Sequence, residues 1–116
     1  MADPSDFQTQ LSAALLTHQY ALVHLYATND PKTGESWCGD CRRAHPVMDQ
    51  LAARHTGVWL DCPVGNREEY KKSAYRDMLQ LSAVPTLYLM SAKGIVKKWV
   101  EAECYAPSIL EEVYIS

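Results

Sequence analysis

The chain has 116 residues, 47% of them hydrophobic and 22% charged, which is the composition of an ordinary globular protein. This length suits one hydrophobic core, and no repeat or linker interrupts it, so we expect a single domain over residues 1–116. The formal net charge of −3 argues against nucleic acid as a partner, because no basic surplus is available to neutralise phosphates.

The first half of the chain predicts a helix, a strand, a loop and a second helix. Apolar residues recur at helical spacing over residues 4–17. Residues 20–28 are apolar on both alternations, which favours a strand buried on both faces, and residues 29–36 have loop composition. A helix is expected over residues 38–55, and Pro46 should kink it because proline removes an internal hydrogen bond.

A short strand over residues 57–62 precedes a third predicted helix, over residues 66–80. Asn66 is its expected N-cap, and Glu69 stands three residues later, which is the spacing of a capping box.

The last elements are two strands, over residues 84–90 and 95–102, and a helix over residues 108–114. The turn between the two strands is short enough to make them a hairpin. Strands that alternate with helices imply parallel pairing, so the fold class is α/β, with a central mixed sheet and helices on both faces.

No apolar stretch approaches the ~18 residues that cross a membrane. The first ten residues also lack the apolar segment of a secretory signal. We therefore expect a cytoplasmic monomer that contacts neither membrane nor nucleic acid.

Two of the four cysteines, Cys38 and Cys41, form a Cys-x-x-Cys pair that directly precedes the second predicted helix. This position is typical of a redox-active dithiol, because side chains three residues apart on a first helical turn can reach disulfide distance. The helix N-terminus favours a thiolate, so Cys38 is the expected nucleophile. Cys41 lies one turn further in and is the expected resolving cysteine, which attacks the mixed disulfide.

Two other interpretations of the pair remain open. Cys38 and Cys41, with His45 and Cys62, supply sulfur and nitrogen ligands for half of a zinc site, although no second pair of ligands at a typical spacing completes it. The pair is alternatively two inert core thiols. Cys62 and Cys104 are expected to be structural, because free cysteines are commonly buried.

Several segments together resemble the thioredoxin superfamily, and they span most of the chain. They are LVHLYA (residues 22–27), WCGDCRRAHPVMDQ (37–50), AVPTLYLMSAKG (83–94) and VEAEC (100–104). The acidic Asp40 and the long loop before Trp37 are similar to a narrower group, the small thioredoxin-related proteins of the thioredoxin domain-containing protein 17 type. The motif of that group is Trp-Cys-Pro-Asp-Cys, and Gly39 stands here in place of its proline.

The resemblance implies a thioredoxin fold and a disulfide reductase that uses the Cys38 and Cys41 dithiol. It implies substrates that are small molecules, peptides or selected proteins, and a flavoprotein reductase, or a small dithiol, as electron donor. No metal or organic cofactor is expected. A redox-regulated binding module with little turnover is the alternative function, and a zinc-binding interaction domain is a further one.

The resemblance also assigns residues around the cysteines. A cis peptide bond is expected between Val84 and Pro85, and it would turn the Val84 backbone toward an extended substrate. Trp37 is expected to be an exposed aromatic rim that contacts substrate, with a packing residue as the alternative.

Two residues between the cysteines are expected to tune the reactivity of Cys38. The Asp40 carboxylate stabilises a helix N-terminus, yet its charge disfavours a nearby thiolate, so we expect it to moderate Cys38 rather than inactivate it. Gly39 adds a backbone donor and flexibility.

His24 occupies the strand position at which thioredoxins carry a buried acid, and this makes it a candidate for proton transfer to and from Cys41. The alternative is a histidine that only packs in the core.

Overall fold

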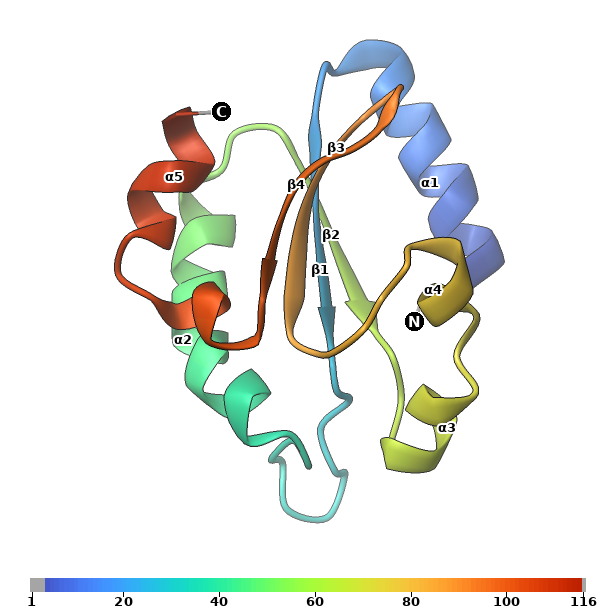
Figure 1. The fold of residues 1–116 in the computed structure, drawn as a ribbon, viewed down its shortest axis with the longest axis vertical. Coiled ribbons are helices and arrows are strands. Elements are labelled where there is room, and N and C mark those ends of the chain that lie inside the picture. Colours follow the sequence, from blue (N-terminus) through green and yellow to red (C-terminus); the bar gives the residue numbers. More distant parts are fainter. Residues whose placement is uncertain (1–3, 116) are drawn as a thin grey trace.

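One four-stranded sheet, in the order β2-β1-β3-β4, forms the centre of the protein (Figure 1). The computed structural model describes residues 4–115. Its strands are β1 (Ala21–Tyr26), β2 (Val58–Pro63), β3 (Thr86–Ser91) and β4 (Gly94–Val100). β1 pairs parallel with β2 and antiparallel with β3, and β3 and β4 form an antiparallel hairpin. The sheet is therefore mixed, as the sequence predicts.

Helices cover both faces of this sheet, which confirms the predicted α/β class. Figure 1 shows α2 and α5 on one side, and α1, α3 and α4 on the other. The bounds of the helices are α1 (Pro4–Thr17), α2 (Gly39–Arg54), α3 (Arg67–Lys71), α4 (Ala74–Met78) and α5 (Ile109–Ile115), with a 3₁₀ helix η1 (Glu101–Tyr105) after β4. None of the described helices combines the length and apolar character needed to cross a membrane.

The strand β1 contributes to two separate hydrophobic clusters. Its alternate residues point to opposite faces of the sheet. Leu22 packs in a cluster with Met48 and Leu51 of α2. Val23 and Leu25 pack in a second cluster on the other face. This two-sided burial explains why the strand is apolar on both alternations.

The segment over residues 66–80 differs from its prediction, because two short helices replace the expected single one. The capping box at the start of α3 is present: Asn66 Oδ1 accepts from the Glu69 amide, and Glu69 Oε1 accepts from the Asn66 amide (both 2.9 Å). The chain then leaves the helix, and Ser73 caps α4 by accepting a hydrogen bond from the Tyr75 amide (3.2 Å). Serine competes for backbone donors in this way, so it favours a new helix start.

The hairpin also ends earlier than expected. β4 stops at Val100, and Glu101 adopts a positive φ of 54°, after which the chain forms η1. Pro46 lies inside α2, as predicted. The kink expected there stays a prediction.

Candidate active site

The sulfur of Cys38 lies at the N-terminus of α2, where Cys38 is the N-cap residue. It accepts a hydrogen bond from the Cys41 amide (3.1 Å). A hydrogen bond from the Cys41 side chain is the main cause that lowers the pKa of Cys38 to about 7, while burial opposes the change. A negative sulfur is favoured here because both donors and the positive end of the helix dipole point toward it.

The pKa of Cys41 is shifted in the opposite direction. Burial and its hydrogen bond to Cys38 raise the pKa of the Cys41 thiol, with the hydrogen bond as the larger cause. The Ala27 amide contacts its sulfur at 3.5 Å. When the pair loses its first proton, the thiolate therefore forms on Cys38 and the remaining proton stays on Cys41. Both side chains are nearly enclosed, with 9% of Cys38 and 6% of Cys41 exposed.

The loop that precedes β3 packs against this pair. The Val84–Pro85 peptide bond is cis, as expected. The carbonyl oxygen of Val84 lies 3.5 Å from the Cys38 sulfur. An extended segment that paired with the backbone at Val84 would therefore pass directly over Cys38.

Trp37 is half-buried rather than an exposed rim, so this part of the expectation is wrong. Its indole N–H donates to the Gly65 carbonyl (3.1 Å), and the Arg67 guanidinium lies over its ring, 5.3 Å from the centroid. The Tyr70 ring lies 6.0 Å from it. These contacts fix the indole beside Cys38 as one wall of the site.

The Asp40 carboxylate is held by two donors. Its Oδ1 accepts from the Tyr105 phenol (2.8 Å) and from Arg43 (3.0 Å). The charge of Asp40 raises the pKa of Cys38, as expected, while the Asp40 backbone amide lowers it, an effect that was not predicted. At Gly39, an added Cβ would meet only the ends of the Arg43 and Arg42 side chains, 3.4 and 3.7 Å away, so no close approach requires glycine.

His24 is buried, with 4% of its surface exposed. Its Nδ1 lies 3.3 Å from Asp61 Oδ1, and its ring stacks on Tyr26 with centroids 4.7 Å apart. The hydrogen bond to His24 is the main cause that lowers the pKa of Asp61. His24 and Cys41 line the same cavity of about 270 Å³. The structure thus connects the two residues through a shared space.

The remaining cysteines lie in the core. Burial raises the pKa of Cys62 to about 11 and that of Cys104 to about 12, so both thiols stay protonated. The Cys104 sulfur lies 3.2 Å from the Trp99 carbonyl oxygen. Within residues 4–115, no three His, Cys, Asp or Glu side chains are grouped so that they could hold a metal ion.

The site includes a residue that sequence reasoning missed, Gly65. Its carbonyl accepts from the Thr28 amide (3.1 Å) as well as from the Trp37 indole, and its own amide donates to Thr28 Oγ1 (2.9 Å). Its φ is +95°, and an added Cβ would lie 2.7 Å from the Cβ of Glu69. The one signal in the sequence is a glycine directly before the N-cap Asn66. Tyr105 was also missed, and nothing in the sequence connects it with Asp40.

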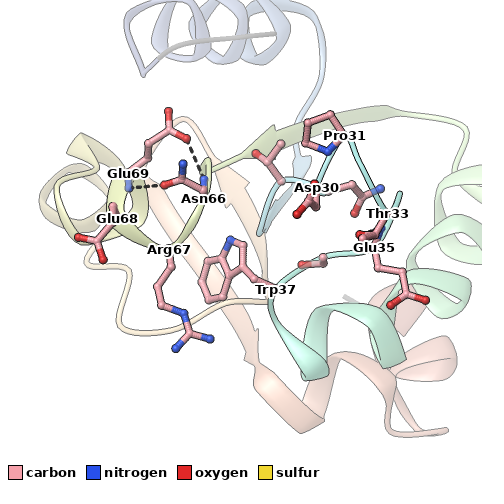
Figure 2. A pocket seen from close by; sticks show the side chains of 12 residues that line it. Asp30, Pro31, Thr33, Glu35, Trp37, Asn66, Arg67, Glu68 and Glu69 are labelled. Atoms are coloured by element: carbon pink, nitrogen blue, oxygen red, sulfur yellow. Dashed lines mark hydrogen bonds between the residues drawn. The ribbon is translucent and has the colours of Figure 1, made fainter.

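Gly65 holds together the two walls of a pocket of about 540 Å³ beside Trp37 (Figure 2). One wall is the loop before Cys38, and the other is the segment that begins α3. Figure 2 shows Trp37 between Asp30 on one side and Asn66 and Glu69 on the other. The pocket lining thus includes Trp37, the residue directly before Cys38.

Comparison with solved structures identifies the fold. Thioredoxin NaTrxh from Nicotiana alata has a TM-score of 0.69, covers 97% of this chain and 85% of its own, and is 19% identical. Thioredoxin f2, solved in a complex with ferredoxin:thioredoxin reductase, also has a TM-score of 0.69 at 19% identity, with 99% and 93% of the two chains covered. Both neighbours show that the protein has the thioredoxin fold, with its Cys-x-x-Cys pair at the start of α2.

The sequence places it more narrowly. The family model described as thioredoxin domain-containing protein 17-like, thioredoxin domain, matches residues 3–116. Thioredoxin domain-containing protein 17 of Mus musculus is 31% identical over 110 residues, which cover 90% of this chain and 87% of that protein. The chain belongs to this family, which confirms the resemblance seen in its motifs.

Proposed function

We propose that the protein is a disulfide reductase. The Cys38 thiolate attacks one sulfur of a substrate disulfide, the substrate S–S bond breaks, and the released thiolate takes up a proton. Cys41 then loses its proton and attacks the Cys38 sulfur, which releases the second substrate thiol and leaves a Cys38–Cys41 disulfide. Two electrons thereby pass from the cysteine pair to the substrate. An external reductase then supplies two further electrons, which restore the dithiol.

The observation that carries this proposal is the unequal proton affinity of the two thiols. With a pKa of about 7, Cys38 is about half ionised at neutral pH, and its pKa is near the optimum for an attacking thiol. The raised pKa of Cys41 keeps that thiol protonated until the mixed disulfide forms. The first attack is therefore assigned to Cys38 and the second to Cys41.

The backbone at Val84 supports substrates that present their disulfide on an extended strand, because the Val84 carbonyl lies beside the Cys38 sulfur. We propose small-molecule, peptide and selected protein disulfides as substrates. A flavoprotein reductase, or a small dithiol, is the proposed electron donor. The choice of electron donor rests on the family and on thioredoxin f2, a protein of the same fold that was solved with a reductase. The cytoplasm, which keeps dithiols reduced, is the proposed compartment.

We also propose that His24 assists the second attack. Cys41 must lose its proton in a buried place, and the cavity it shares with His24 provides room for water between the two groups. The Asp61 carboxylate orients the imidazole through its 3.3 Å contact with His24 Nδ1.

A reductase-coupled assay across cystine, glutathione disulfide and insulin tests the function. Turnover should be lost in Cys38→Ser, while Cys41→Ser should accumulate a mixed disulfide between Cys38 and substrate, detected by mass spectrometry. Full activity of Cys38→Ser would exclude Cys38 as the nucleophile. Redox-dependent binding of a partner without turnover would instead support the binding-module alternative.

A further inference from the structure

The pocket beside Trp37 is lined by Ser36 and Trp37, the two residues that directly precede Cys38 in the chain. Its volume of about 540 Å³ is sufficient for an amino-acid side chain with part of its backbone. The three hydrogen bonds at Gly65 join its walls, so the pocket is already formed without a substrate. Trp37 is both a wall of the pocket and the residue directly before Cys38.

The pocket combines an apolar wall with negative charge. Trp37 and Pro31 supply apolar surface. The carboxylates among the lining residues are Asp30, Glu35, Glu68 and Glu69, and the single lining cation is Arg67, so the formal charge of the lining is −4 + 1 = −3. Glu68 is paired with Lys71 outside the lining (3.4 Å), so the lining stays negative even when this pair is set aside.

These two features match one class of side chain. Lysine and arginine carry an apolar stem that ends in a positive group, so the stem packs along an indole while the charge reaches the carboxylates. Arg67 already lies over the Trp37 ring in this manner. An acidic side chain would meet the same carboxylates with repulsion.

We propose that this pocket binds a basic side chain next to the reacting cysteine of the substrate, so that the protein prefers disulfides flanked by lysine or arginine. The inference rests on the proposed reductase function and specifies its substrate class. The cation is bound in the pocket while Cys38 attacks the neighbouring sulfur, and no bond to the pocket residues forms or breaks.

The test uses three peptides that differ only in the residue beside a single cysteine: lysine, norleucine or glutamate. Each peptide is joined to a 2-pyridyl disulfide, so that attack by Cys38 on the peptide sulfur releases a coloured thione. The second-order rate constant with reduced protein should follow the order lysine, norleucine, glutamate. The expected step is about two- to fivefold, the range of exposed charge pairs, and it should shrink as salt is added.

The matched variant is Asp30→Asn with Glu69→Gln. Both replacements keep the oxygen that accepts from Lys32 and Asn66, so the walls keep their backbone bonds while two charges are lost. The ratio of the lysine rate to the norleucine rate should fall toward one. Glu111→Gln on α5, which changes charge far from the pocket, is the control and should keep the full preference.

A second measurement does not depend on reactivity. The same peptides with serine in place of cysteine are added to reduced protein, and the indole N–H resonance of Trp37 is followed by NMR. The lysine peptide should shift this signal more than the norleucine peptide does. The inference would be overturned if the lysine and norleucine peptides shifted the Trp37 signal equally and the three peptides were reduced at equal rates, or the glutamate peptide faster. The reductase function would then remain intact. No reduction of any peptide would instead overturn the proposed function, and the NMR result would still decide the pocket.

Discussion

The Tyr105 phenol donates a 2.8 Å hydrogen bond to Asp40, a residue 65 positions earlier in the chain. Asp40 lies between the two cysteines, and its charge raises the pKa of Cys38. The phenol, together with Arg43, holds that carboxylate on the η1 side of α2 and disperses its charge. A contact outside the cysteine motif thus bears on the reactivity of the motif.

Tyr105→Phe should therefore raise the pKa of Cys38 and slow its alkylation at neutral pH. A roughly twofold loss is expected, because only one donor to the carboxylate disappears. Alkylation by iodoacetamide as a function of pH measures both quantities. Adding Asp40→Asn to the variant should lower the pKa of Cys38 again, since the carboxylate is the source of the effect. An unchanged profile in Tyr105→Phe would show that the phenol has no part in tuning.

The Cys41 side chain has the largest effect on the pKa of Cys38, so removing this side chain should shift the titration of Cys38. Cys41→Ala removes the side-chain donor but keeps the backbone amide, and the pKa of Cys38 should rise from about 7 toward its ordinary value. Cys41→Ser keeps a donor and should change the pKa less. Thiolate absorbance against pH distinguishes the two, and equal shifts would contradict the assigned cause.

The same low pKa predicts how the stability of the reduced protein depends on pH. A thiol with a lowered folded pKa binds its proton more weakly in the folded state than in the unfolded state. The contribution of Cys38 to the free energy of unfolding is therefore fully present above the unfolded pKa of about 8.5, and it is lost as pH falls through about 7. Relative to Cys38→Ser, the wild-type protein should gain unfolding free energy between pH 7 and pH 8.5 in urea titrations. A constant difference across that window would contradict the lowered pKa.

Gly65→Ala should destabilise the protein by about 1–3 kcal/mol, because it adds a Cβ to a residue with φ of +95°. Gly34→Ala is the matched control: its φ is +75°, but its added Cβ would meet nothing within 4 Å. Urea unfolding compares the two, and the larger loss at Gly65 measures the clash with Glu69. Equal losses would show that backbone strain alone is responsible.

His24→Asn should slow the release of substrate from the mixed disulfide by about a hundredfold, the lower end of the range for proton-transfer catalysis. Alkylation of Cys38 should proceed at its normal rate, because the first attack does not use His24. Rapid quenching of the mixed disulfide at several pH values measures the step. If its pH profile were the same in both proteins, His24 would be only a packing residue.

Most helices and strands could be predicted from the sequence, because the signals that mark them are local. The bounds of α1 and β1 follow from apolar periodicity, and Asn66 with Glu69 marks the start of α3. The break between α3 and α4 was missed, because an N-cap serine inside an apolar pattern also fits an uninterrupted helix.

The site was predictable only in part. The position of Cys38 at the helix start follows from the pattern, and the cis bond before Pro85 follows from the resemblance. The anchoring of Trp37 by Gly65 and of Asp40 by Tyr105 depends on side chains that the fold brings together from distant segments. Sequence spacing carries no signal for such contacts.

The small exposed area of Cys38 acts as a geometric filter in the proposed reaction. Only 9% of Cys38 is exposed and the Val84 carbonyl lies 3.5 Å from its sulfur, so a disulfide that lies flat in a folded domain would be held off by shape. A disulfide carried on a narrow, protruding stem can reach the thiolate. In the proposed reaction, shape would therefore limit which disulfides reach the sulfur, and the charge of the pocket beside Trp37 would act on those that do.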